Sequence, residues 1–263
     1  MMDDEKVKQK VKETFGKNAE KYIKSESHAK GDDLQLLVEW MQPQSNWIVL
    51  DIATGGGHVA KTLAPHVDTV YATDLTEQML SNTAGHLSKA CSNIFYVLAD
   101  AENLPFLEET FDVVTCRIAP HHFPNPNKFI KEASRVLKPG GKFLLIDNVA
   151  PEEKHLGVFM NTVEKLRDES HFRCLSVNEW KELFASNGLQ EIQSQNRKKR
   201  FQFPTWVRVT AKNEQQIDTV EQYLLNADEV LKTYFSIVMN ENEDHVLSHQ
   251  IDEWMVLCEK KVN

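Results

Sequence analysis

From Trp47 onward the sequence alternates short apolar runs with amphipathic stretches, and this alternation limits the fold more than any other feature of the chain. The order strand, helix, strand, helix is that of a parallel α/β sheet. The strand runs are almost continuously apolar, as expected for strands that helices cover on both faces. The clearest runs are WIVLDI, VDTVYATD, NIFYVLAD, FDVVTC and KFLLIDN. We therefore predict an α/β protein with a mostly parallel sheet.

The alternating part occupies residues 48–147 of the 263, so more than half of the chain is accessory to it. The residues before it carry apolar side chains at helical spacing. Behind it, the pattern predicts a helix over 177–187 and a sixth strand over 189–194. Apolar residues in 217–238 follow a heptad-like spacing that predicts one helix or two stacked ones, in a cap or equally in a homodimer interface. The last apolar run, 254–258, predicts a returning edge strand.

Composition excludes several classes of protein. With 30 Lys and Arg against 39 Asp and Glu, the net charge of -9 argues against a nucleic-acid partner, which needs a basic face. The longest apolar run, Ile94 to Ala99, is far shorter than the roughly twenty residues that cross a bilayer. The charged start MMDDEKVKQK does not resemble a secretory signal, so we expect a cytoplasmic protein without a membrane span.

The four cysteines are far apart in sequence and form no C-x-x-C pair, so we expect free thiols and no metal site. Acidic residues concentrate near the end of the chain. Residues 213–259 hold eleven acidic residues and one lysine. This predicts an acidic helical cap on a near-neutral body, and it favours a neutral or cationic substrate over a polyanionic one.

The sharpest local pattern is VLDIATGGGHVAKT, in which a strand runs into glycines and then a helix. Glycines there permit positive φ and close approach of the backbone to a ligand. The pattern G-x-G-x-x-G/A of dinucleotide sites fits Gly55, Gly57 and Ala60. The phosphate-binding pattern G-x-x-x-x-G-K-T fails because Ala60 stands at its second glycine. A third pattern, D-x-G-x-G-x-G, fits Asp51, Gly55 and Gly57, with Ala53 in place of its first glycine.

Acidic residues close two successive strands after this loop. Asp74 ends the second strand, at a distance that suits a carboxylate bonded to a ribose diol. Asp100 ends the third strand and is followed by the small residue Ala101. Nicotinamide-binding proteins have no general need for this second acid.

Together these motifs resemble the class I S-adenosylmethionine-dependent methyltransferases, and most closely the type 11 family, similar to the ubiquinone and menaquinone biosynthesis C-methyltransferases. The segments FDVVTCRIAPHHF, RVLKPGGKFLLIDN and WMVLCEKK extend the resemblance, as do FGKNAEKYIKSESHAKGDDL and RDESHFRCLSVNEW. The resemblance implies a Rossmann-like, mostly parallel seven-stranded sheet with helices on both faces and a helical cap. It implies one structural domain with three parts: a helical segment over the cofactor at 1–46, a cofactor-binding core at 47–150, and the remaining strands with a substrate cap at 151–263.

The same resemblance implies S-adenosylmethionine as the cofactor. Asp51, Gly55 and Gly57 would form the loop at its methionine side, Asp74 would hold the ribose and Leu75 would flank the adenine. Asp100 and Ala101 would read the adenine edge. Two further residues are expected at the cofactor, Tyr22 and Arg117, although Arg117 could instead pair with an acidic neighbour. We expect Ala53 to weaken or re-angle cofactor binding, while still forming the turn if its φ stays negative.

Candidate catalytic residues are histidines. His121 and His122 follow the fourth strand, where open α/β sheets place ligands, and a histidine can remove a proton near neutral pH. His171 lies in a polar cluster behind the fifth strand, where the family usually builds its substrate cap. Structural roles, as caps or in an exposed helix, are the alternatives. His245 and His249 have the i, i+4 spacing of a helical metal pair, but without a third ligand we expect them to be exposed.

The predicted reaction moves a methyl group from S-adenosylmethionine to carbon, oxygen or nitrogen of a small, partly apolar molecule. A base is helpful but not obligatory, because the sulfonium is already an activated leaving group. Two alternatives stay open. One is a non-catalytic S-adenosylmethionine-binding protein, and the other is an NAD(P)-dependent oxidoreductase.

Overall fold

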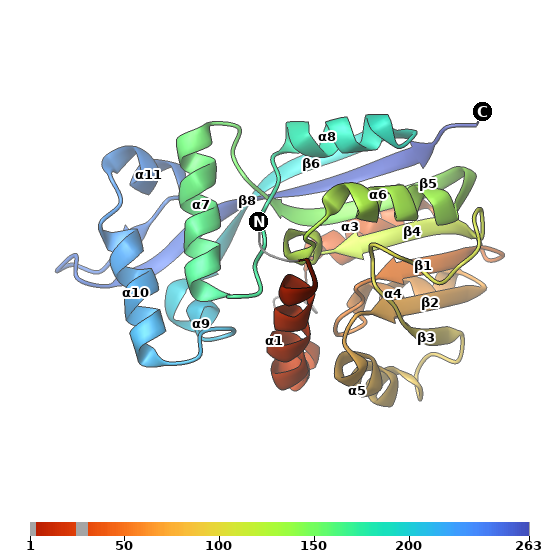
Figure 1. Ribbon diagram of the computed structural model, residues 1–263, viewed down its shortest axis with the longest axis horizontal. Helices are drawn as coiled ribbons and strands as arrows, with labels where there is room; N and C mark the ends of the chain where they lie inside the picture. The colour runs from red at the N-terminus through yellow and green to blue at the C-terminus, as the bar shows by residue number, and fades with distance from the viewer. Residues whose placement is uncertain (1–3, 25–30, 263) are drawn as a thin grey trace.

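The computed structural model describes residues 4–24 and 31–262, and of residues 17–24 it describes the backbone only. Within these residues the chain forms an eight-stranded sheet in the order β3-β2-β1-β4-β5-β8-β6, with the short β7 paired to β8 (Figure 1). The strands are β1 (Ile48–Ile52), β2 (Thr69–Asp74), β3 (Ile94–Leu98), β4 (Phe111–Arg117), β5 (Leu137–Val149), β6 (Leu189–Gln202), β7 (Val238–Met239) and β8 (Val246–Lys260). The predicted seven strands are those of the main path, and β7 is additional.

Helices separate the first five strands, except β3 and β4, between which a loop runs, and further helices build the far end of the molecule. They are α1 (Asp4–Lys24), α3 (Asp32–Met41), α4 (His58–Leu63), α5 (Glu77–Leu87), α6 (Pro126–Val136), α7 (Lys154–Arg167), α8 (Val177–Ser186), α9 (Phe203–Val207), α10 (Glu214–Leu225) and α11 (Glu229–Tyr234). Two 3-10 turns, η1 (Ala64–His66) and η2 (Pro120–His122), complete the described elements. None of the described helices has the length and apolarity that a bilayer crossing requires.

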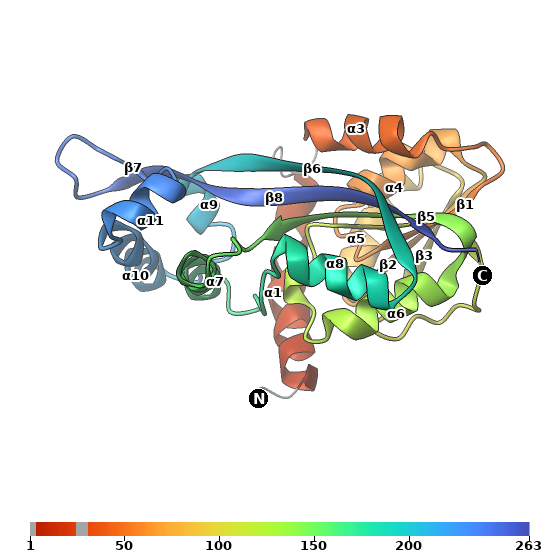
Figure 2. The same ribbon diagram turned by 90° about the horizontal axis from the view of Figure 1, so that it is seen from above.

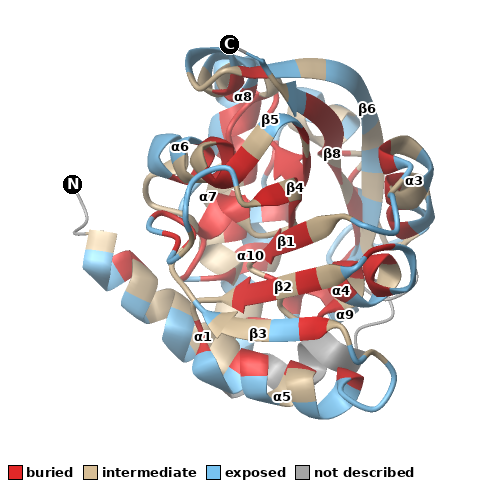
Figure 3. Cartoon of the chain, turned by 90° about the vertical axis from the view of Figure 1, so that its right-hand side faces the viewer, coloured by how far each residue is buried: buried red, intermediate tan, exposed pale blue. Residues whose placement is uncertain are grey.

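The five strands from β3 to β5 are parallel. The apolar side chains of β1, β2, β4 and β5 are largely buried on both faces, whereas the edge strand β3 exposes Phe95 and Leu98 (Figure 3). One core cluster joins the sheet to α6 and α8 through residues such as Phe129 and Trp180. The other joins the opposite face to α3 and α4 through Leu37 and Leu63. Helices on both faces explain why these strands lack the polar alternation of a half-exposed sheet.

The last strand is antiparallel, as a returning strand must be, but it is not at the edge. β8 lies between β5 and β6 and pairs with both over most of its length. Figure 2 shows β6 and β8 running as a long ribbon beyond the end of β5. β6 therefore continues well past the predicted end at Ser194, to Gln202.

The sequence also contains four consecutive basic residues, Arg197 to Arg200, and they lie inside β6. Arg197 and Lys199 both pair with Glu253 of β8, whose side chain is buried. Lys198 pairs with Asp252 at 3.0 Å. This basic run thus neutralises acidic residues of the neighbouring strand. Ion pairs within the sheet therefore already engage cations that could otherwise bind an anionic partner.

A third core cluster fills the cap. It joins α7, α9, α10 and the cap end of β8, and Phe203 and Trp206 are among its buried residues. The heptad-like stretch forms two helices because Asp228 starts a new one, its side chain accepting a hydrogen bond from Leu231 N at 2.9 Å. His249 lies in β8 and is buried, so the expectation that it is exposed was wrong, whereas His245, just before β8, is exposed as expected. Neither residue lies on a helix.

Candidate functional site

A cavity opens at the carboxyl ends of the parallel strands, under α1. It holds about 1040 Å³ of empty space, including its mouth toward solvent. Its walls come from the ends of β1, β2, β3 and β4, from the loops that follow them, and from α1. The residues that line it include Lys8, Phe15, Asp51, Ala53, Gly55, Asp74, Leu75, Met79, Asp100, Ala101, Glu102, Arg117, Ile118, His122 and Phe123. This is where open α/β sheets bind ligands.

The loop between β1 and α4 forms one wall through a run of left-handed residues. Gly55 and Gly57 have φ of 53° and 74°, and Ala53 has φ of 52°. The negative φ that was set as the condition for Ala53 to form the turn is therefore not met: the turn forms with Ala53 in a left-handed conformation that residues with a Cβ disfavour. Gly57 N donates to Thr54 O at 2.8 Å within the turn, and Thr54 N donates to Thr73 O of β2 at 2.7 Å.

Gly57 does not line the cavity. It caps α4, and a Cβ added there would lie 2.5 Å from Thr83 Cγ2 and 2.7 Å from Leu87 Cδ1 of α5. The third position of the glycine pattern thus serves the packing of α4 on α5.

Two carboxylates support the glycine loop. Asp51 is buried and accepts hydrogen bonds from Thr54 Oγ1 at 2.6 Å and Thr115 Oγ1 at 2.8 Å. Burial raises the pKa of Asp51 to about 6, although these hydroxyl donors oppose the shift. Asp74 accepts from Gly55 N at 3.1 Å and Thr76 N at 2.9 Å, and burial likewise raises its pKa. Asp74 thereby ties the end of β2 to the loop after β1.

The carboxylate of Asp100 is bonded on both oxygens. Oδ1 accepts from Glu102 N at 2.9 Å, and Oδ2 accepts from Lys8 Nζ of α1 at 2.7 Å. Lys8 also pairs with Glu102 at 2.8 Å. Lys8 and Glu102 were not among the predicted site residues. An apolar helix pattern gives no sign of which lysine reaches across the cavity.

Arg117 ends β4 and lines the cavity, but its guanidinium also pairs with the buried Asp33 of α3. The Asp33 carboxylate lies 3.3 Å from Arg197 as well, and these cations outweigh its burial and lower the pKa of Asp33. The acidic neighbour considered from the sequence is thus present, and it fixes where Arg117 points.

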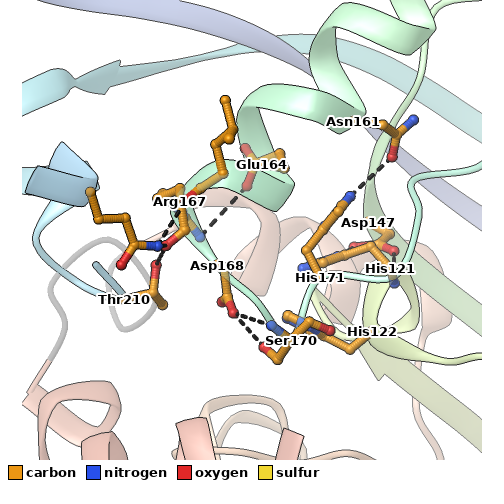
Figure 4. A network of polar contacts seen from close by, with 12 residues as sticks. His121, His122, Asp147, Asn161, Glu164, Arg167, Asp168, Ser170, His171 and Thr210 are labelled. Carbon is orange, nitrogen blue, oxygen red and sulfur yellow. Dashed lines mark hydrogen bonds and ion pairs between the residues drawn. The ribbon is translucent and has the colours of Figure 1, made fainter. Parts of the chain in front are cut away.

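Three buried histidines gather beside the cavity (Figure 4). The rings of His121 and His122 have centroids 4.3 Å apart, and His171 lies 5.6 Å from His121. Among them only His122 lines the cavity, where its ring meets the Phe15 ring edge-on at 4.9 Å.

His121 is paired with Asp147 at the end of β5. Its Nδ1 lies 2.6 Å from Asp147 Oδ1, and its backbone N donates to Oδ2 at 3.0 Å. Burial lowers the pKa of His121, but the Asp147 carboxylate outweighs burial and the net shift is upward. Burial and the neighbouring His121 lower the pKa of His122 to about 3. The same causes lower the pKa of His171, whose Nε2 contacts Asn161 Oδ1 at 3.0 Å.

Of the predicted cofactor residues, eight line this one cavity: Asp51, Ala53, Gly55, Asp74, Leu75, Asp100, Ala101 and Arg117. Gly57 stands behind it. The Tyr22 side chain, like Ser25 and His28 near it, lies outside the described residues. Of the catalytic candidates, His122 faces the cavity, whereas His121 and His171 stand behind it in the described part of the chain.

In this Rossmann-like sheet an acidic residue lies at or just after the end of each of the first three strands, and all three line one cavity, as expected for the class I methyltransferase fold. The sequence pattern of the methyltransferase-domain family matches residues 50–145. The chain is 37% identical over 234 residues to the uncharacterised methyltransferase YcgJ of Bacillus subtilis strain 168, covering 87% of this chain and 90% of that protein. The chain belongs to this methyltransferase family.

Two other similar proteins differ in how much of the chain they match. The solved structure of BH2331 from Bacillus halodurans C-125, assigned as a methyltransferase, has a TM-score of 0.85 and 37% identity, covering 88% of this chain and all of that one. The ubiquinone/menaquinone biosynthesis C-methyltransferase UbiE of Rickettsia typhi is 35% identical over 113 residues, which is 40% of this chain and 46% of that protein. The similarity to YcgJ and BH2331 thus includes the cap, whereas the similarity to UbiE covers less than half of either chain.

Proposed function

We propose that this protein uses S-adenosylmethionine to methylate carbon, oxygen or nitrogen of a small, partly apolar molecule. One observation carries the proposal: the glycine loop, Asp74 and Asp100 share a single cavity, in the arrangement that a cofactor with a charged end, a ribose and an adenine requires. When bound, the cofactor supplies a methyl group on a sulfonium, which is already activated for transfer. The protein's task is then to hold the acceptor in line with that methyl group.

The cavity residues divide into those that suit the cofactor and those that suit the acceptor. Asp74 would hold the ribose diol, and Leu75 and Met79 would flank the adenine. Asp100 would take the adenine amine by sharing Oδ2 with Lys8, or after Lys8 moves away. Phe15, Ile118 and Phe123, with His122 as their polar neighbour, would face the acceptor. Apolar walls of this kind support a partly apolar acceptor.

The proposed roles of the cavity residues also divide the chain into three parts. Residues 1–46 would cover the cofactor, 47–150 would bind it, and 151–263 would supply the remaining strands and the substrate cap. A small-molecule acceptor leaves no role for nucleic acid, in keeping with the acidic composition. A cytoplasmic location and a homodimer through the cap remain predictions.

Turnover tests the proposal. Formation of S-adenosylhomocysteine is measured with a panel of phenols, quinols and amines, for the wild type and for His122→Ala. We expect turnover with at least one class of acceptor, and a reduction in kcat of about 10²-fold or more in the variant if the acceptor must lose a proton. Binding of the cofactor that depends on Asp74, with no turnover on any acceptor, would favour the non-catalytic binding protein instead.

A further inference from the structure

We propose that Ser170 and Asp168 are positioning residues for His122, which fix the imidazole tautomer whose unprotonated Nε2 faces the cavity. The proposal rests on the proposed function for its chemical meaning, but its geometry is independent of it. Neither residue lines the cavity, and both lie in the loop between α7 and α8.

The loop is held by Asp168. Its Oδ1 accepts two hydrogen bonds from Ser170, one from the backbone N at 2.8 Å and one from Oγ at 2.5 Å. Both residues are buried, so water does not compete for these bonds. Because the Ser170 hydroxyl proton is committed to Asp168, its oxygen can only accept a hydrogen bond from a third group.

That third group is His122. Its Nδ1 lies 3.1 Å from the Ser170 carbonyl oxygen and 3.3 Å from Ser170 Oγ. A carbonyl oxygen cannot donate, and Oγ has already donated, so Nδ1 must carry the proton. A neutral imidazole protonated on Nδ1 has a bare lone pair on Nε2. Among the described residues nothing hydrogen-bonds to Nε2, and the ring lines the cavity.

Burial is the largest influence on the protonation state of His122, and it disfavours the imidazolium. His121 and Arg167 also disfavour it, whereas Asp168 and the Ser170 carbonyl favour it, and the pKa of His122 falls to about 3. Burial raises the pKa of Asp168, but Arg167 and the Ser170 donors, together with His122 when it is protonated, outweigh burial and the net shift is downward. At neutral pH the histidine is therefore an acceptor, with a carboxylate placed to stabilise positive charge that develops on it.

This arrangement selects a class of acceptor. The cavity cations are engaged, Lys8 by Asp100 and Glu102 and Arg117 by Asp33. The polar group beside the apolar wall is thus the His122 imidazole, with a lone pair on Nε2. A hydrogen-bond acceptor there suits an uncharged molecule bearing O–H, N–H or an acidic C–H. In the step, the acceptor atom forms its bond to the methyl carbon, the S–C electron pair leaves with the thioether, and the acceptor's proton passes to Nε2.

The tautomer can be measured directly. Long-range ¹H–¹⁵N correlation spectra of the full chain labelled in histidine nitrogen distinguish Nδ1–H from Nε2–H, and His122→Gln identifies the signals. We expect His122 to be protonated on Nδ1, against the preference of free histidine for Nε2–H. Protonation of His122 on Nε2 would overturn the proposal.

Two variants of Asp168 separate geometry from charge. Asp168→Asn keeps an oxygen that can accept both Ser170 donors, so the tautomer is expected to persist while kcat falls by about tenfold through loss of the charge. Asp168→Ala removes the acceptor, and we expect mixed tautomers and a fall in kcat of about 10- to 100-fold with little change in KM. Thr210→Val is the matched control, because it removes a 3.3 Å bond to the Arg167 carbonyl at the same end of α7. The control is expected to leave the His122 tautomer unchanged.

An unchanged tautomer in Asp168→Ala would contradict the positioning role. The spectra need no substrate, so they judge it even where the enzyme assay fails. An Nδ1–H signal that shifts in Asp168→Ala supports the positioning role, and absence of turnover on every acceptor would then count against the proposed function alone.

Discussion

Ala53 is the residue at which this chain departs from the glycine pattern of its family, and it adopts φ of 52°. The left-handed conformation costs an L-residue about 1 to 2 kcal/mol. The cost falls on a residue that lines the cavity. The chain thus retains the turn that the glycine would make, with a methyl group projecting from it.

Replacement of Ala53 by glycine is expected to stabilise the fold by up to about 1 kcal/mol, since relief of strain exceeds the greater freedom of glycine in the unfolded chain. We also expect the affinity for S-adenosylmethionine to rise. Chemical denaturation and calorimetry measure the two effects. The control is Gln42→Gly, a left-handed residue at the end of α3 that does not line the cavity, which should change stability alone. Weaker cofactor binding in Ala53→Gly would contradict this account.

At the scale of elements, Gly57 links the cofactor loop to the packing of α4 on α5. Gly57→Ala combines a left-handed φ of 74° with a Cβ that would lie 2.5 Å from Thr83 Cγ2. We expect it to destabilise the fold by about 2 to 4 kcal/mol, the sum of backbone strain and overpacking. Gly188→Ala is the matched control, because Gly188 has the same φ of 74° with no atom near its missing Cβ. Its loss should be limited to about 1 to 2 kcal/mol, and equal losses in denaturation experiments would contradict a packing role.

The elements of the core could be predicted because their signals are local. Strands β1 to β5 have apolar runs in their sequences, and all but the edge strand β3 are buried on both faces. Any parallel sheet brings acids at the carboxyl ends of its strands together. The position of β8 could not be read from its own residues, because an inner strand and an edge strand can share one apolar pattern. The same holds for Lys8, Glu102 and Ser170, whose roles depend on contacts between distant segments.

At the scale of the whole molecule, buried histidines in the cap and beside the site make the stability of the fold depend on pH. Burial lowers the pKa of His122 and His249 to about 3, and it lowers that of His171 as well. An unfolded chain would bind protons at these residues below about pH 6.5, whereas the folded chain does not. Their contribution to stability is therefore lost as pH falls from about 6.5 toward 3. His121 behaves oppositely, because its pKa is raised and its contribution is lost as pH rises.

His249 isolates this effect in the cap. It is 2% exposed, and neither of its ring nitrogens has a hydrogen-bond partner in the described structure. Between about pH 6 and pH 4 the wild type should lose roughly 1.4 kcal/mol of unfolding free energy per pH unit more than His249→Leu. Denaturant unfolding across this pH range measures the difference. Parallel curves for the two proteins would show that His249 does not resist protonation in the folded state.

The central claim is that one cavity at the strand ends binds S-adenosylmethionine through the glycine loop, Asp74 and Asp100. Calorimetric titration of the full chain with S-adenosylmethionine, S-adenosylhomocysteine and NAD tests it most directly, with Asp74→Ala as the variant and Asp244→Ala, on the exposed hairpin between β7 and β8, as the control. We predict binding of both sulfur compounds to the wild type and the control, with a loss of at least about tenfold in Asp74→Ala as a charged hydrogen bond is removed. Binding of NAD without binding of either sulfur compound would contradict the account.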